Sequence, residues 1–258
     1  MASQSQLSDL SSQITDAVTT INAFLSEKNL EQPSLSAVGP LIFPKANGEV
    51  ELARSTVREA ARKLQILVDG PAEYLQWELC CRFLDMAVLK WINQHDIPSY
   101  VPLESSVSYS ELAKSAGVEE EVLRRVIRFG ITLGIFAEPS KDAVAHTALS
   151  AVFVKYPIIQ SWVSFSTNES TLSATKLVEA LHDPQRSAFQ IAYGTDKNHF
   201  QWIGDKAEYV KSFAVSMEVL GRSAGYSADH LVNGYDWEAL GKAKIVDVRN
   251  CQSMISLY

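Results

Sequence analysis

The last apolar segment of the chain limits its fold more than any other. Residues Lys244 to Val248 are short, apolar and β-branched and follow the turn at Gly241, which predicts a buried strand. Such a strand opens most nucleotide-binding α/β domains, where a glycine-rich turn follows because the backbone must approach the ligand closely. Here Arg249 to Tyr258 follow, and none of these ten residues is glycine. We therefore expect a strand with no sheet to join.

Composition and charge exclude several classes of protein. With 258 residues and 47% hydrophobic content, the chain can bury a substantial core in one large or two small domains. The net charge of −7 disfavours nucleic acids and anionic membranes as partners. The N-terminus carries no apolar signal region, and no apolar run reaches the roughly 18 residues of a membrane span. Three cysteines form neither a disulfide framework nor a metal-binding pattern, so we expect a cytoplasmic protein without a metal site.

Most of the chain before the last strand has helical periodicity. Apolar residues recur every three to four positions from Leu7 to Leu25, and a second helix is expected over 51–68 after a proline-containing connector. Residues 73–93 are apolar on most faces, so this helix should be central to the core. Further helices are expected over 171–182, 185–193 and 207–222. The fold class is therefore mainly α.

The middle of the chain has the pattern of a winged helix. Residues 109–134 read as two short helices about a turn at Ala116-Gly117, and 135–138 with 144–147 read as a β-hairpin. One interpretation is a transcription factor, but the second helix begins with Glu119-Glu120-Glu121, three negative charges where DNA would lie. The other interpretation, a platform for packing and dimerisation, agrees better with this charge.

An aromatic stripe precedes the last strand. Tyr209, Phe213 and Met217 share one helical face, and Phe200 and Trp202 are expected on a turn just before it. Such a stripe is typical either of a core or of a pocket for flat ligands. His199 and His230 are interpreted as surface or capping residues, because neither has a partner at metal-ligand spacing.

Several segments together resemble one family. They are "FQIAYG", "HFQW", "FAVSM" and "YDWEALGKAKIVDV", with "AHTALS" on the wing of the winged helix. In this order and spacing the chain up to Val248 is similar to the fungal S-adenosylmethionine-dependent O-methyltransferases, which are related to plant caffeate-type enzymes. That family has a helical winged-helix dimerisation region, a bridging helix that lines the acceptor pocket, and a Rossmann-like domain that binds the methyl donor.

The resemblance implies domains and site residues. It implies an N-terminal helical dimerisation arm (1–70), a winged-helix dimerisation domain (71–160), bridging and substrate-lining helices (161–236), and a remnant first strand with an unrelated tail (237–258). Tyr209, Phe213 and Met217 would line the acceptor pocket, with Phe200 and Trp202 close by. The implied partners are a second copy or a full-length homologue and a hydrophobic aromatic or polyketide metabolite.

The sequence departs from the family after Val248. The family has a glycine-rich loop there, whereas this chain has Arg249 and Asn250, whose side chains would occupy the space of the donor. We therefore expect no S-adenosylmethionine site and no catalytic residues in this chain. Its function would be that of an O-methyltransferase homologue of secondary metabolism that does not transfer methyl groups alone. The alternatives are a non-catalytic dimerisation or metabolite-binding protein, and a cofactor-independent cyclase or isomerase of the pericyclase kind.

Overall fold

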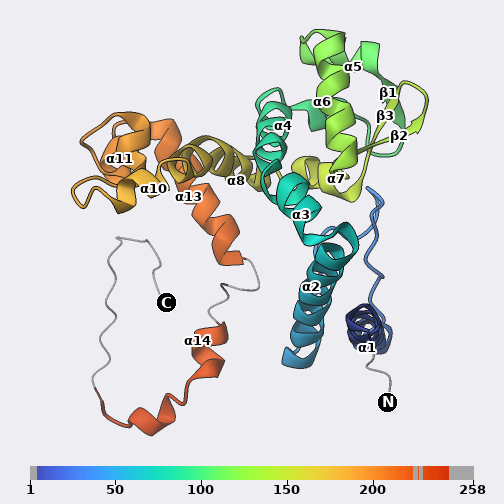
Figure 1. The fold of residues 1–258 in the computed structure, drawn as a ribbon, viewed down its shortest axis with the longest axis vertical. Coiled ribbons are helices and arrows are strands. Elements are labelled where there is room, and N and C mark those ends of the chain that lie inside the picture. The colour runs from blue at the N-terminus through green and yellow to red at the C-terminus, as the bar shows by residue number, and fades with distance from the viewer. Residues whose placement is uncertain (1–4, 223–225, 227–228, 244–258) are drawn as a thin grey trace. The chain divides into compact units, whose positions relative to one another are not determined.

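The computed structural model describes residues 5–222, 226 and 229–243. The chain divides into two compact units, Met1–Val219 and Leu220–Tyr258, and each is described by itself. The described residues of both units are mainly helical, as the periodicity predicts (Figure 1). Within the described residues, no helix combines the length and apolar character that crossing a membrane requires.

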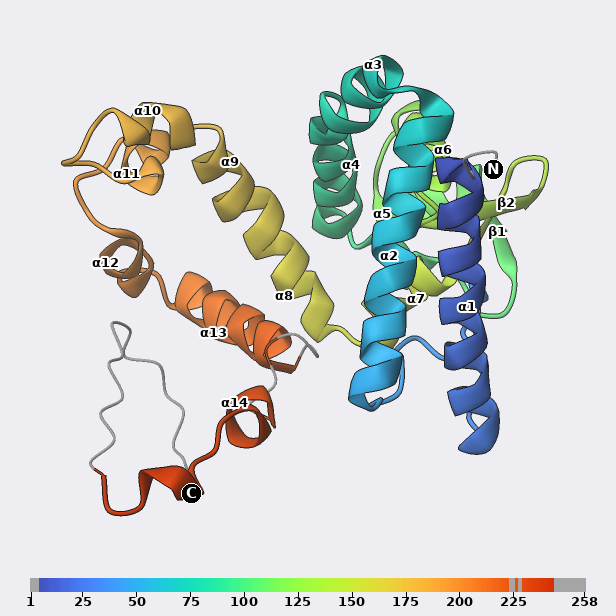
Figure 2. The same ribbon diagram turned by 60° about the horizontal axis from the view of Figure 1, so that its bottom comes forward.

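Two long helices form the N-terminal arm. They are α1 (Gln6–Glu27) and α2 (Gly48–Asp69), and they pack side by side (Figure 2). Each starts at a side-chain cap: Ser5 accepts a hydrogen bond from the backbone N–H of Ser8, and Asn47 accepts one from Val50. Small and branched apolar side chains are buried on the two helices, namely Leu10, Ala17, Leu25, Val50, Ala53 and Ala60.

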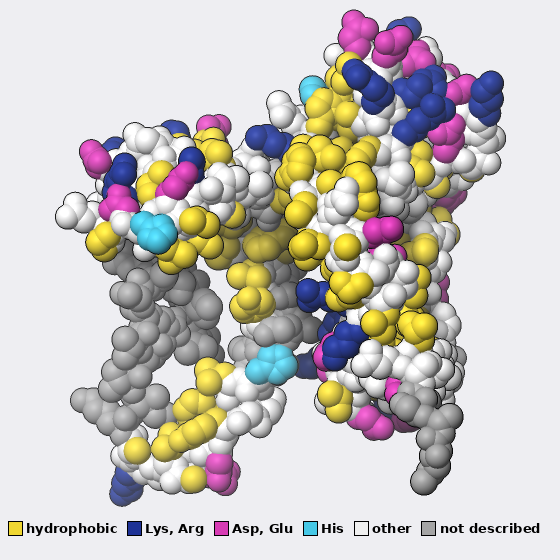
Figure 3. Space-filling view, viewed as in Figure 1, with side chains coloured by type: hydrophobic (Ala, Val, Ile, Leu, Met, Phe, Trp, Pro, Cys, Tyr) yellow, Lys and Arg dark blue, Asp and Glu magenta, His cyan; other side chains and the backbone are white. Residues whose placement is uncertain are grey.

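The next helical segment differs from its prediction. Residues 73–93 were expected to form a helix central to the core, but the chain forms α3 (Pro71–Glu73), a π-helical turn η1 (Tyr74–Leu79) and α4 (Arg82–Gln94). Only Tyr74 and Ile92 of these elements are buried, whereas Leu75, Trp77 and Phe83 are 56%, 61% and 65% exposed. Figure 3 shows hydrophobic side chains gathered over α3 and α4. The expectation of one continuous core helix is therefore wrong for its first part, whereas the end of α4 does reach the core through Ile92.

The predicted helices and hairpin of the middle region are present. After the 3₁₀ turn η2 (Ile97–Tyr100) come β1 (Ser106–Ser108), α5 (Tyr109–Ala116), α6 (Glu120–Thr132), β2 (Phe136–Ser140) and β3 (Ala143–His146). The strands form an antiparallel sheet in the order β1-β3-β2, with Val107 opposite Val144 and Phe136 opposite His146. Strand β1 was not anticipated, because three residues are too short to show an alternating pattern.

The main hydrophobic core lies in this middle region. Its buried members come from α4, η2, α5, α6 and the sheet: Ile92, Ile97, Val101, Tyr109, Leu112, Ala113, Leu123, Ile127, Ile135, Phe136 and Val144. The α5–α6 turn depends on Gly117, which has a φ of 66°. On α6, Arg124 pairs with Glu120 and Asp142, and Arg128 pairs with Glu138.

The rest of the first unit is helical. It comprises α7 (Ala148–Lys155), α8 (Ile158–Phe165), the π-helical turn η3 (Ser166–Ser170), α9 (Thr171–Ala174), α10 (Leu177–Leu181), α11 (Ala188–Tyr193), α12 (His199–Gly204) and α13 (Ala207–Arg222). The segment expected as one helix over 171–182 is therefore two, and the helix expected over 185–193 begins at Ala188. Helices α8 and α13 touch where the Ser216 hydroxyl donates to the Ser161 carbonyl at 3.1 Å.

The second unit has short elements. They are α14 (Asp229–Gly234) and the 3₁₀ turn η5 (Glu238–Leu240), joined where the indole N–H of Trp237 donates to the carbonyl of Leu231 at 2.9 Å. The predicted strand, residues 244–248, lies outside the described residues.

Candidate functional site

Helices α8, α11, α12 and α13 bring eight rings together. We call this set the aromatic cluster, and its neighbouring ring centroids lie 4.5–6.2 Å apart, most of them edge to face. Its members are Phe165, Phe189, Tyr193, His199, Phe200, Trp202, Tyr209 and Phe213. Centroid spacings in this range are favourable for aromatic pairs.

Four of the five residues singled out in the sequence belong to this cluster. Phe200 packs against Phe213 with ring centroids 5.7 Å apart, and Trp202 packs against Tyr209 at 5.0 Å. Phe200 and Trp202 lie on the short helix α12 and not on a turn, which corrects the expectation. Met217 lies one helical turn after Phe213 on α13 and is half-buried.

Side-chain caps fix the short helices that carry the cluster. At the start of α11, Ser187 and Gln190 form a reciprocal capping box, and Asn198 and Gln201 do the same for α12. Helix α11 ends at Gly194, whose φ of 58° favours glycine. Because isolated helices of six residues are not stable, these caps and the ring contacts hold α11 and α12 in place.

A histidine–glutamate pair lies among the rings. Nε2 of His199 is 2.6 Å from Oε2 of Glu169, and Glu169 is only 4% exposed. The His199 side chain is 22% exposed and packs edge-on against Phe165 and Phe189. The interpretation of His199 as a surface or capping residue is therefore wrong. Sequence reasoning missed the pair because its members are 30 positions apart.

The π-helical turn η3 holds Glu169. Helix α8 continues through η3 into α9, and the Thr171 hydroxyl bonds to the Ser166 carbonyl, five residues back, at 2.7 Å. A π-helical turn adds a residue to a helical turn and is frequent at functional sites. Glu169 and Thr167 are buried here, although polar residues such as these usually face solvent. The local sequence "STNES" carries no signal of this geometry.

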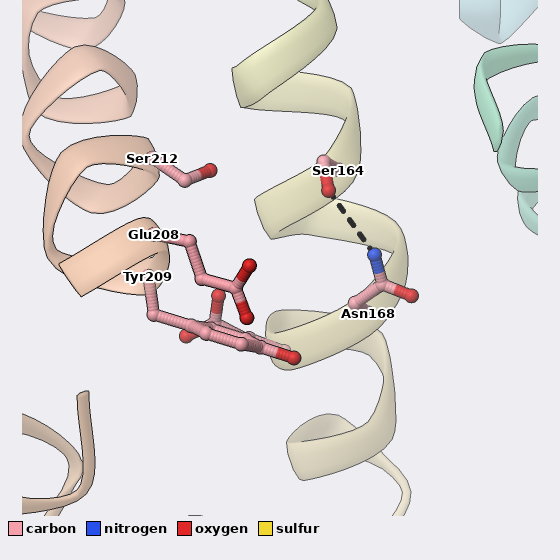
Figure 4. Close-up of a pocket in the computed structure, with 6 residues that line it drawn as sticks. Ser164, Asn168, Glu208, Tyr209 and Ser212 are labelled. Atoms are coloured by element: carbon pink, nitrogen blue, oxygen red, sulfur yellow. Dashed lines mark hydrogen bonds between the residues drawn. The ribbon is translucent and has the colours of Figure 1, made fainter. Parts of the chain in front are cut away.

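Two clefts meet at Glu169. One, of about 210 Å³, is mostly aromatic and is lined by Phe165, Ser170, Ser173, Phe189, His199 and Phe213 together with Glu169. The other, of about 270 Å³, is polar and is lined by Ser164, Asn168, Glu208, Tyr209 and Ser212 together with Glu169. Figure 4 shows Glu208, Tyr209 and Ser212 projecting from α13 toward Ser164 and Asn168. A ligand that occupied both clefts would contact aromatic side chains at one end and polar side chains at the other.

Tyr193 adds a neutral donor beside the pair. Burial is the main cause that raises the pKa of Tyr193. Electrostatic repulsion from Glu169, and to a smaller extent from Tyr209, raises this pKa further. Its hydroxyl donates to the carbonyl oxygen of Asn168 at 3.4 Å. The hydroxyl therefore stays protonated at neutral pH and supports the η3 turn.

Two kinds of group are not found among the described residues: a set of three metal-ligating side chains, and a glycine turn between a strand and a following helix. Among these residues, no group of three His, Cys, Asp or Glu side chains could hold a metal ion. Within residues 5–222 and 229–243, no glycine stands between a strand and a following helix: α5 follows β1 directly, and only Thr147 separates β3 from α7. A Rossmann-type dinucleotide site requires a glycine-rich turn of this kind.

Two family descriptions match parts of the chain. Residues 77–156 match the O-methyltransferase dimerisation domain. Residues 4–69 match the N-terminal domain of the trypacidin cluster transcriptional coactivator tpcD. The boundary between the matches falls between α2 and α4.

Curated relatives match nearly the whole chain. It is 34% identical over 257 residues to the O-methyltransferase aurJ of Gibberella zeae, covering 96% of this chain and 58% of the relative. It is 33% identical to the O-methyltransferase bik3 of Gibberella fujikuroi, covering 96% of this chain and 56% of the relative. The chain therefore spans less than two thirds of the length of these relatives.

Solved structures share the fold. The crystal structure of OxaC matches with a TM-score of 0.65 at 17% identity, covering 91% of this chain and 55% of that one. LepI, solved in complex with SAH and a substrate analogue, matches with a TM-score of 0.59 at 15% identity, covering 80% of this chain and 50% of that one. Over nearly its whole length the chain is thus similar in sequence to fungal O-methyltransferases, and residues 77–156 match the O-methyltransferase dimerisation domain.

Proposed function

We propose that this chain provides the dimerisation and acceptor-binding part of an O-methyltransferase-type protein. The aromatic cluster would bind a hydroxylated aromatic or polyketide-like metabolite of secondary metabolism. The observation that carries the proposal is the pair of clefts at Glu169, one aromatic and one polar. A flat ligand with a polar edge matches such a site, because ring faces contribute most of the contact area and a few polar groups fix orientation.

The middle region is proposed to be a winged helix used for dimerisation and not for DNA binding. Helix, turn, helix and three-stranded sheet occur in the winged-helix order, and residues 77–156 match a dimerisation domain. On α6, the second helix of the motif, Arg124 and Arg128 already pair with Glu120, Asp142 and Glu138. Cations that are paired in this way contribute little to phosphate binding. The partner would be a second copy or a longer homologue.

We further propose that residues 1–258 do not bind S-adenosylmethionine on their own. When bound, this donor supplies an electrophilic methyl group for an acceptor hydroxyl. Two observations support this proposal: within the described residues no glycine stands between a strand and a following helix, and Arg249 and Asn250 follow the predicted last strand where the family has a glycine-rich loop. In the proposed site, the residues of this chain orient the acceptor and exclude water from it.

Non-catalytic metabolite binding is the second candidate. It is favoured because described residues of α8, η3, α9, α11, α12 and α13 form the aromatic cleft among themselves. A cofactor-independent cyclase or isomerase is a third candidate, supported only by the fold shared with a structure described as a pericyclic reaction enzyme, at a TM-score of 0.55 and 16% identity. Turnover of a bound compound without S-adenosylmethionine would favour this third candidate.

Binding of a simple aromatic probe tests the proposed site. The purified chain is titrated with 1-methoxynaphthalene, and the emission of its tryptophans is followed because Trp202 lies in the cluster. We expect saturable binding, which Phe213→Leu weakens about threefold to tenfold, because the substitution removes ring contacts but keeps apolar volume. Tyr156→Leu, at an exposed position just after α7, is the control and should bind as wild type does.

Calorimetry tests the donor proposal separately. The chain is titrated with S-adenosylmethionine at concentrations up to about 1 mM, where a 1 mM dissociation constant corresponds to about 4 kcal/mol. We expect no saturable heat. A micromolar dissociation constant would show that this chain does contain a donor site.

A further inference from the structure

The His199–Glu169 pair has a geometry that packing alone does not require. We propose that His199, oriented by Glu169, recognises the hydroxyl group of the ligand by accepting its hydrogen bond. This inference rests on the proposed function, because it assigns a role within the same acceptor site. The ligand class it specifies is a neutral phenol or other aromatic alcohol of one or two rings.

The pairing with Glu169 decides which nitrogen of His199 can accept. A carboxylate oxygen can only accept, so Nε2 carries the hydrogen in its 2.6 Å contact with Oε2. In the neutral imidazole the other nitrogen, Nδ1, is then an acceptor. A buried carboxylate that holds one tautomer of a histidine is a recurrent way to direct the remaining nitrogen at a ligand. His199 lines the aromatic cleft, and the proposal assigns Nδ1 to the ligand that binds there.

The aromatic cluster limits the size and shape of the ligand. The ring plane of His199 is inclined by 62° to 84° to the planes of four neighbouring phenylalanine rings. The imidazole is therefore surrounded by aromatic rings in edge-to-face contact. The aromatic cleft has a volume of about 210 Å³. This is below the roughly 300 Å³ at which pockets for drug-sized compounds begin, so a ligand of one or two rings suits it.

The charges around the clefts favour a hydrogen-bond donor over an anion. Glu169 lines both clefts and Glu208 lines the polar one, and no Lys or Arg is among the described residues that line either. Burying a carboxylate or phosphate ligand next to Glu169 would cost free energy, because like charges repel strongly where water is excluded. A neutral hydroxyl avoids this repulsion and still donates to His199.

A matched pair of probes tests the inference. The chain is titrated with 1-naphthol, which carries a hydroxyl, and with 1-methoxynaphthalene, which has the same rings but cannot donate. We expect wild type to bind 1-naphthol about fivefold to tenfold more tightly, the range of one hydrogen bond. His199→Phe keeps a ring in the cluster and should reduce this preference to about one. In Glu169→Gln the amide can donate to Nε2, which moves the ring hydrogen to Nδ1, so the preference should fall as well.

The controls separate recognition from packing. His182→Phe makes the same change at an exposed histidine and should keep the preference of wild type. Thermal melts of each variant report whether it folds, and Glu169→Gln is the second test should His199→Phe unfold. Equal affinity of wild type for the two probes would overturn the role of His199 and leave the aromatic site standing. No binding of either probe would overturn the proposed function, and the role of His199 with it.

A folded His199→Phe variant that binds neither probe would point to a different role for His199. It would show that His199 maintains the shape of the cleft and does not read the hydroxyl, which contradicts the proposal. Weaker binding of 1-naphthol alone is the expected result, because only that probe uses the hydrogen bond.

Discussion

At the scale of single residues, buried polar side chains reveal which positions the fold constrains. His146, at the end of β3, is 8% exposed; its Nε2 is 2.9 Å from the carbonyl oxygen of Val101 and its Nδ1 is 2.8 Å from the Ser150 hydroxyl. Because a carbonyl oxygen only accepts, Nε2 carries the hydrogen and Nδ1 accepts from Ser150. The neutral ring therefore satisfies both contacts and links β3 to α7 and to the end of η2.

This burial makes folding stability depend on pH. Desolvation lowers the pKa of His146, and the nearby charge of Lys155 acts in the same direction, while hydrogen bonds to Val101 and Pro98 oppose it. The unfolded chain takes up a proton as the pH falls through about 6.5, whereas the folded chain does so only at lower pH. Stability is therefore fully present above pH 6.5 and is lost as the pH falls below it.

We expect His146→Gln to show a smaller loss of stability on acidification than wild type. Urea unfolding at pH 7.5 and pH 5 measures the difference, and the variant should be less stable at pH 7.5 because a buried contact is lost. His182→Gln, at an exposed histidine, is the matched control and should follow wild type at both pH values. An unchanged pH dependence in His146→Gln would contradict this assignment.

At the scale of elements, helix ends and helix irregularities fix the geometry. The π-helical turn η3 places Glu169 inside the first unit, and Gly117 lets the chain reverse between α5 and α6. At Gly117, an added Cβ would meet no atom within 4 Å, so only the φ of 66° opposes a side chain there. The cost of a substitution at this turn is therefore backbone strain and not a steric clash.

Gly117→Ala should lower the free energy of unfolding by about 1–2 kcal/mol, the cost of a left-handed conformation for an L-residue with a side chain. Gly48→Ala is the matched control, because Gly48 begins α2 and an added Cβ would likewise meet no atom within 4 Å. It should be neutral or stabilising by about 0.5 kcal/mol, since alanine restricts the unfolded chain. Chemical denaturation of both variants compares them; equal effects would rule out strain at Gly117 as the cause.

At the scale of the whole molecule, η1 and the start of α4 form an exposed apolar surface. Leu75, Trp77 and Phe83 on η1 and α4 are more than half exposed, and Trp77 and Phe83 lie in the stretch that matches the dimerisation domain. Exposed aromatic patches of this kind mark interaction sites, and aromatic side chains are enriched at them. The first part of the expected core helix, residues 75–83, is thus largely exposed within one chain, which agrees with burial by a second chain.

Trp77→Glu combined with Phe83→Glu should convert a dimer into a monomer. In the dimer, two charges would then have to be buried in the interface. The free energy of burying them is larger than the effect of the same substitution at a position that stays exposed. Light scattering after size exclusion measures the mass. Val178→Glu, 69% exposed on α10 and outside residues 77–156, is the control and should keep the mass of wild type. A wild-type mass for the double variant would place any interface elsewhere.

Local patterns in the sequence were sufficient for many of the elements. The spacing from Leu7 to Leu25 predicts helix α1, and a helix is predicted over 207–222; both predictions are confirmed. Gly117 was predicted in the turn before α6, and the hairpin was predicted after it. These features depend on the spacing of apolar residues, on helix caps and on glycine in turns. All three are interactions or constraints between residues close together in the chain. The same spacing placed Tyr209 and Phe213 on one face.

The sequence by itself thus determined that α1, α2 and α13 are helical and that Tyr209 and Phe213 share one face of α13. Only the tertiary structure decided that Glu169 meets His199, that η3 contains a π-helical turn, and that residues 73–83 expose apolar side chains. The reason is physical. Helical periodicity is set by contacts three to four residues apart, whereas the His199–Glu169 contact joins two helices far apart in sequence and forms only when the surrounding rings pack.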